Sequence, residues 1–144
     1  MRVFVRTIFL FAFVALFSTV AFACSCNFMS PSKKLRKAKA VFVGEALEIG
    51  SNDKSADFPV TIRFKVERYW KGAKQENITV VTTPLACCTC ALGATVGVKY
   101  LIYAFETEEG ELETSLCTSI AYERAVDELK VLGKGKKLKP KAKT

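Results

Sequence analysis

The cysteines with the most distinctive placement are Cys24 and Cys26, which are separated only by Ser25. We expect a signal peptide to be cleaved after Ala23, which would make Cys24 the first residue of the mature protein. A cysteine in that position brings together a free α-amine, its own carbonyl and a thiol that can tie the backbone to the rest of the chain. The start of the mature chain is therefore the region where we expect its function.

Residues 1–23 have the three-part pattern of a secretory signal peptide. Basic residues precede an apolar run from Thr7 to Phe17, and small residues stand at positions −3 and −1 of the cleavage site. The run from Thr7 to Phe17 is shorter than the ~20 residues that a membrane-spanning helix needs. We expect cleavage and a secreted protein, periplasmic if the host is Gram-negative. The alternative is a lipoprotein anchored through Cys24, but Ala21 followed by Phe22 fits that motif poorly.

The positive charge of the chain is concentrated at its C-terminal end. The formal net charge is +8, and seven lysines lie from Lys130 onward without an acidic residue among them. Residues 24–129 are therefore close to neutral, and we expect no nucleic-acid-binding face on the folded body. We interpret residues 133–144 as a disordered Lys-rich tail, with a weak contact to an anionic surface as the alternative.

All six cysteines lie beyond the signal peptide and are expected to enter an oxidising compartment, where disulfide pairing is the default. Six cysteines allow 15 connectivities, and spacing alone does not choose among them. The chain has no histidine, which excludes the usual Ser-His-Asp and Cys-His arrangements and removes the commonest zinc ligand. The glutamates between 106 and 113 surround a predicted turn, where a solvated cluster explains them better than acid–base catalysis. We expect no enzyme activity and no cofactor or metal of its own.

A mainly β domain is predicted to position these cysteines. Short strands are predicted at residues 41–49, 60–68, 78–82, 98–105 and 111–117. Gly44 marks a bend or bulge in the first of them, and Gly110 marks a turn before the last. Five short strands predict a small barrel of the five-stranded OB type.

Two helices are predicted at the ends of the domain. Ser30 and Pro31 provide a helix start, and a short helix follows as far as Lys39. A second, amphipathic helix spans residues 122–132, ends at Gly133 and packs on the barrel. Its apolar stripe comprises Tyr122, Ala125, Val126, Leu129 and Leu132.

Over residues 24–132 the chain resembles the N-terminal inhibitory domain of the tissue inhibitors of metalloproteinases and, more broadly, the netrin-like modules. The order and spacing of several segments carry this resemblance, and it implies an OB-type barrel. The segments are Cys24-Ser25-Cys26, Ala40-Val-Phe-Val-Gly44, Phe64-Lys-Val-Glu-Arg-Tyr-Trp-Lys-Gly72, Cys90, Tyr100-Leu-Ile-Tyr-Ala104 and Thr114-Ser-Leu-Cys117.

The resemblance implies two disulfides, Cys24–Cys90 and Cys26–Cys117. Disulfides at both Cys24 and Cys26 would hold the start of the mature chain in one rigid conformation. A third disulfide of the family has no counterpart, because Arg36 stands where that bond begins. The pairing of Cys87 and Cys88 stays open between a vicinal bond, reduced thiols and a bond to another chain.

The resemblance also implies that the chain is an inhibitor of zinc metalloproteases, and we expect it to be a monomer. The α-amine and carbonyl oxygen of Cys24 would chelate the zinc of the protease and replace its water. Ser25 would enter the specificity pocket, with further contacts from Cys26, Cys88 and Thr89.

Two alternatives remain open. One is a secreted binding module of the netrin-like OB type that inhibits no protease, including a lipoprotein form. The other is a metal or redox centre at Cys87-Cys88-Thr89-Cys90, which has a Cys-x-x-Cys spacing but lacks the βαβ context of a thioredoxin-like site.

Overall fold

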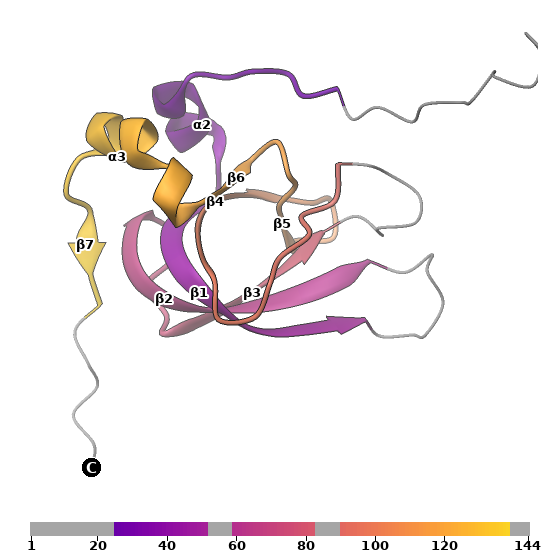
Figure 1. The fold of residues 1–144 in the computed structure, drawn as a ribbon. Helices are drawn as coiled ribbons and strands as arrows, with labels where there is room; N and C mark the ends of the chain where they lie inside the picture. The colour runs from indigo at the N-terminus through magenta and orange to yellow at the C-terminus, as the bar shows by residue number, and fades with distance from the viewer. Residues whose placement is uncertain (1–24, 52–58, 83–89, 139–144) are drawn as a thin grey trace, which may run out of the picture.

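The computed structural model describes residues 25–51, 59–82 and 90–138. In these residues a closed five-stranded barrel carries two short helices on one side (Figure 1). In chain order the elements are α2 (Pro31–Lys37), β1 (Ala40–Ser51), β2 (Val60–Lys71), β3 (Asn77–Thr82), β4 (Lys99–Glu106), β5 (Leu112–Glu113), β6 (Ser119–Ala121), the 3-10 helix η1 (Tyr122–Arg124), α3 (Val126–Leu132) and β7 (Lys136–Lys137).

The barrel closes in the order β1-β2-β3-β5-β4, because β4 pairs back onto β1. The β3–β5 pairing is parallel, and the other pairings of the ring are antiparallel. Two further short strands lie outside the ring, β6 on β4 and β7 on β2. The structure confirms the predicted fold class, a mainly β, five-stranded OB-type barrel with a helix before the first strand and another after the barrel.

The barrel interior follows from strict alternation in β2. Ile62, Phe64 and Val66 are buried, whereas the residues between them are exposed. The Phe64 ring meets the rings of Phe42 and Tyr100 edge to face, with centroids 5.8 Å and 6.2 Å apart. Aromatic pairs in this arrangement stabilise a core beyond the area that they bury. The interior is therefore apolar and filled by side chains of β1, β2, β3 and β4.

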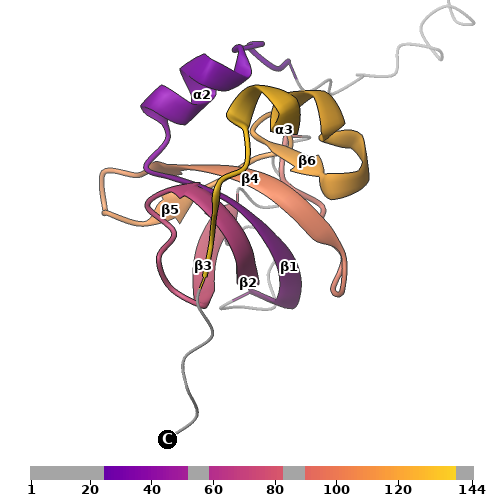
Figure 2. The ribbon, with the colours of Figure 1, turned by 90° about the vertical axis from the view of Figure 1, so that its left-hand side faces the viewer.

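A second apolar cluster lies outside the barrel, under the two helices. Leu101 and Tyr103 of β4 point to it, while the alternate residues of the same strand point into the barrel. Strand β4 is therefore covered on both faces, which explains its nearly continuous apolar sequence. Ala38 after α2 and Ala125 before α3 are buried against the same cluster, and both helices lie on the side of the barrel where β4 runs (Figure 2).

Glycines lie where the predicted irregularities occur. The β1–β2 register shifts between Val43 and Gly44, and a Cβ on Gly44 would lie 2.9 Å from the carbonyl oxygen of Lys65. Gly110 has φ 83° in the turn between β4 and β5, where its N–H donates to the Thr107 carbonyl. The bulge and the turn are both confirmed.

Three predictions about the C-terminal half are wrong in detail. Only Leu112–Glu113 of the expected strand 111–117 pairs in the sheet, because hydroxyl groups fold the following residues into a turn. The predicted helix 122–132 begins as a 3-10 turn, which changes the helical phase and leaves Val126 52% exposed. The first part of the expected disordered tail is ordered, because Lys136 and Lys137 pair with β2. Residues 139–144 lie outside the described residues.

Candidate functional site: three segments around a disulfide

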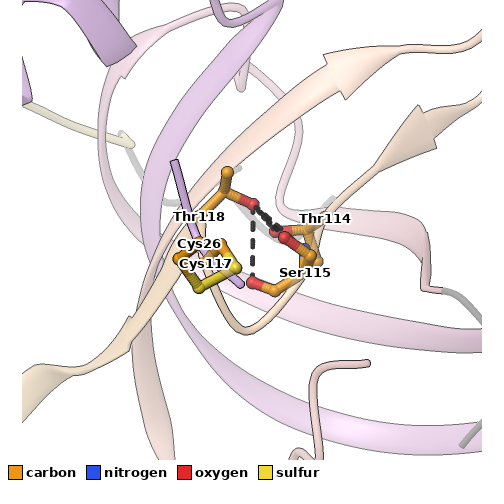
Figure 3. Close-up of a disulfide and its surroundings, with 5 residues drawn as sticks. All are labelled: Cys26, Thr114, Ser115, Cys117 and Thr118. Carbon is orange, nitrogen blue, oxygen red and sulfur yellow. Dashed lines mark hydrogen bonds between the residues drawn. A yellow bond between two sulfur atoms is a disulfide. The ribbon is translucent and has the colours of Figure 1, made fainter. Parts of the chain in front are cut away.

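The Cys26–Cys117 disulfide ties the start of the described chain to the turn that follows β5. The two Cα atoms are 5.4 Å apart, and the bond links residues separated by 91 positions (Figure 3). This is one of the two pairings that the resemblance implies. A disulfide of this kind is typical of proteins in a non-reducing environment.

The turn that carries Cys117 is fixed by hydroxyl groups. Thr118 Oγ1 accepts from the Ser115 N–H at 3.0 Å, and the Thr118 N–H donates to the Ser115 carbonyl at 3.1 Å. Thr114 is 1% exposed, and its hydroxyl donates to the Tyr103 carbonyl at 3.2 Å and lies 2.7 Å from the Ser119 hydroxyl. Because β4 and the turn share these bonds, Cys117 is held at a fixed place beside the barrel (Figure 3).

The segment that begins at Cys90 lies against the same turn. The Leu116 N–H donates to the Cys90 carbonyl at 2.9 Å, one residue before Cys117. Two residues further on, the Leu92 N–H donates to the buried Thr82 hydroxyl at the end of β3, also at 2.9 Å. Cys90 is itself disulfide-bonded. Three segments that are distant in sequence, 25–26, 90–92 and 114–118, therefore meet at one end of the barrel.

The predicted site residues fall into two groups. Ser25 is exposed, and Cys26 and Cys117 are half-buried. Phe28, close to the disulfide along the chain, is 95% exposed, and Leu116 is 51% exposed, so apolar side chains flank the disulfide on the surface. The other predicted members of the site, Cys24, Cys87, Cys88 and Thr89, lie outside the described residues.

A buried charged cluster, which was not predicted from the sequence, fixes helix α2 to α3 and to the barrel. Lys34 Nζ lies 2.8 Å from Glu128 Oε1 and 5.1 Å from the centre of the Tyr103 ring. The Tyr103 hydroxyl donates to Glu128 Oε2 at 2.6 Å. Burial, and then this hydrogen bond, raise the pKa of Tyr103, so the phenol stays protonated and donates. The cluster joins α2, α3 and β4.

The ion pair between Lys34 and Glu128 is expected to contribute more to stability than an exposed pair of equal length. We predict that Lys34→Met destabilises the fold by about 3 kcal/mol, because it leaves a largely buried carboxylate without its cation. The matched control is Lys39→Met. Lys39 Nζ also lies 2.8 Å from a carboxylate, that of Glu106, but both side chains are about half exposed, and we expect a loss below ~0.5 kcal/mol. Urea unfolding measures the loss of unfolding free energy in both variants. Equal losses would contradict the larger contribution assigned to the buried Lys34–Glu128 pair.

The described residues contain neither a helix that is long and apolar enough to cross a bilayer nor a group of three or more potential metal ligands. A comparison with protein-family models found no match for this chain. A comparison with curated proteins found none either. The function is therefore inferred from the geometry of the three segments and from the chemistry of the residues they carry.

Proposed function

We propose that this protein is an exported inhibitor of zinc metalloproteases that occupies the catalytic zinc with the amine and the carbonyl oxygen of Cys24. The observation that supports the proposal most strongly is the meeting of the three segments. The disulfide fixes Cys26, and the Leu116–Cys90 hydrogen bond brings the segment of the other implied cysteine partner beside it.

The anchoring of Cys26 matters because a flexible chain end is a poor inhibitor. Two residues of extended chain span at most ~7 Å, so a bond at Cys26 restricts the residues before it. Restriction before binding lowers the entropy cost of inserting a segment into a cleft. Ser25 is exposed next to this anchor and carries a small side chain, which suits a partner's pocket.

The proposed chemistry uses a property shared by catalytic zinc sites. Three protein ligands hold the metal, and the fourth position is open to the water that attacks the substrate. An amine and a carbonyl oxygen from one residue occupy that position as a chelate and displace the water. Because the amine takes the place of the attacking water, the Cys24–Ser25 peptide bond at the metal is not hydrolysed. Export of the protein is supported by the disulfide, which is typical of non-reducing compartments.

The proposal predicts that inhibition strengthens between pH 6 and pH 8. A protonated amine does not bind a metal, and an ordinary α-amine has a pKa near 7.7 to 8.0. The deprotonated fraction rises about 40-fold over this range, so the inhibition constant falls by about the same factor. The measurement is the inhibition constant of the exported protein against a panel of zinc metalloendopeptidases at each pH.

A control is needed because each protease has its own pH dependence. A small zinc-binding inhibitor without a titrating amine, measured on the same enzyme, gives the correction. A corrected profile that stays flat contradicts chelation by the amine. Absence of inhibition by protein with an unblocked Cys24, across the panel, contradicts the function and leaves a secreted binding module on the same barrel.

A further inference from the structure

The first part of the Lys-rich tail is fixed on the surface of the barrel. The Trp70 indole N–H donates to the Gly133 carbonyl at 3.1 Å, and Lys136 and Lys137 pair with Tyr69 and Arg68 of β2. Strand β3 pairs with β2 only as far as Lys65, so β7 covers the part of this edge that β3 leaves open. The segment runs down one side of the molecule below α3 (Figure 2).

Gly135 explains why the segment lies so close to β2. A Cβ at this position would lie 2.8 Å from Trp70 Cε2 and 3.0 Å from Arg68 Cγ, and the residue has φ 62°. Beyond β7, Leu138 packs partly buried against the barrel core. Side-chain contacts therefore hold the segment at both ends, and backbone pairing holds its middle.

The fixed segment presents a group of cations that we call the cationic face, comprising Arg68, Lys134, Lys136 and Lys137. The three lysines are exposed, and within the described ranges none of the four forms an ion pair with a carboxylate. Two nearby acids on α3 are already paired, Asp127 with Lys130 and Glu128 with Lys34. The field of the cationic face is therefore not cancelled locally.

Further cations border this face at the end of β2. Lys71 Nζ donates to the carbonyl oxygens of Leu35 and Arg36 at the end of α2. Arg36 and Lys37 are exposed there. Lys71 lies two residues after Tyr69, which pairs with Lys136, so the positive charge extends beyond the tail itself.

We propose that the cationic face docks on an anionic phospholipid surface. Lysine ammonium groups act as hydrated point charges and suit the mobile headgroups of a bilayer better than paired recognition of one anion. Val131, in the last turn of α3 between Lys130 and Lys134, is 58% exposed. An apolar side chain among lysines can insert at the boundary between headgroups and acyl chains. A hydrated polysaccharide offers it no apolar surface to bury.

The test is sedimentation of the exported protein with large vesicles of phosphatidylglycerol and phosphatidylcholine in equal parts, and with pure phosphatidylcholine, at about 0.1 M NaCl, where charges within ~10 Å still interact. We expect binding to the anionic vesicles only, weakening as salt rises. Each cation near such a surface contributes a factor of about five, so Lys134→Gln, Lys136→Gln and Lys137→Gln together are expected to weaken binding about 100-fold. The assay contains no protease, so its result is independent of the proposed inhibition.

Two matched controls make the result specific to this face. Arg63→Gln, Lys65→Gln and Lys99→Gln together remove the same formal charge elsewhere on the barrel and are expected to weaken binding less than about threefold. Gly135→Val keeps every cation but displaces the segment, and a loss of about tenfold is expected. Gly110→Val is the control for backbone strain alone. Gly110 also has a positive φ, 83°, but a Cβ there would meet no atom within 4 Å.

Several outcomes overturn the proposal. One is the absence of binding to the anionic vesicles. Another is equal weakening by the two triple variants, which would show that binding depends only on net charge. Wild-type binding by Gly135→Val shows that a fixed face is not required. Face-dependent binding to a soluble sulfated polysaccharide, with none to vesicles, assigns the face to another class of polyanion.

Discussion

Adding one alanine before Cys24 is expected to abolish metalloprotease inhibition while leaving the fold intact. The extension converts the α-amine of Cys24 into an amide nitrogen, which is not a zinc ligand, and moves the new amine by about 3.5 Å along the chain. A loss of ~4 kcal/mol in binding corresponds to an inhibition constant about 1,000-fold higher. The measurement is inhibition of the most sensitive protease of the panel at pH 8.

The matched control adds the same alanine after Thr144, where no effect on inhibition is expected. Thermal unfolding of both extended proteins shows whether the barrel is intact. Mass analysis of the exported protein must first establish a bare Cys24 at its start. Equal inhibition by the N-terminally extended protein would contradict chelation by the terminus, and a fatty chain on Cys24 would exclude it.

The barrel could be predicted because its strands differ from each other in local pattern. Alternation in β2 identifies a strand with one buried face, and the continuous apolar run of β4 identifies one covered on both faces. Gly44 and Gly110 lie where the register shifts and where the chain turns. These patterns are local, so they can be recognised in the sequence without knowledge of the tertiary contacts.

Contacts between distant residues could not be predicted in this way. Lys34 and Glu128 are 94 positions apart and both belong to residue types that are mostly exposed. A signal existed in α2, where Lys34 lies one helical turn before the buried Ala38 and therefore shares its face. The partner of that buried cation had no signal in the sequence.

The prediction of a disordered tail is wrong for the first residues of the tail. Their composition indicates disorder, whereas their pairing with β2 orders them. The lysines and glycines of this segment are typical of disordered chains, yet an open edge of β2 and the Trp70 indole supply partners for its backbone. Gly135 lies at the point where the chain passes too close to Trp70 for a side chain to fit. Only the structure shows that Gly135 permits a close contact with Trp70 instead of loosening the chain.

For the candidate site, the sequence alone left 15 pairings of the cysteines open, and the Cys26–Cys117 bond was implied only by the resemblance. The structure contains this bond and adds a contact that no motif encodes, the hydrogen bond from Leu116 to the Cys90 carbonyl. Hydroxyls of Thr114 and Thr118 fix the turn between them. The site is therefore built by tertiary contacts around residues that the sequence had already marked.

Removing the Cys26–Cys117 disulfide is expected to destabilise the protein by about 4 kcal/mol, because closing a long loop restricts the unfolded chain strongly in the chain-entropy model. The bond closes a loop across a separation of 91 residues. A loss of this size lowers the midpoint of thermal unfolding by roughly 15 °C in a domain of about 120 residues. We also expect loss of inhibition, because Cys26 no longer anchors the start of the chain.

Cys26→Ser, Cys117→Ser and the double variant separate the bond from its individual residues. Each of the three removes the same covalent link, so the three losses of unfolding free energy are expected to be nearly equal and not additive. Ser25→Ala is the matched control, because Ser25 is exposed beside the bond, and it should change stability by less than ~0.5 kcal/mol. If the single losses add up in the double variant, the two cysteines contribute separately and the anchor on which the inhibitor proposal depends is absent.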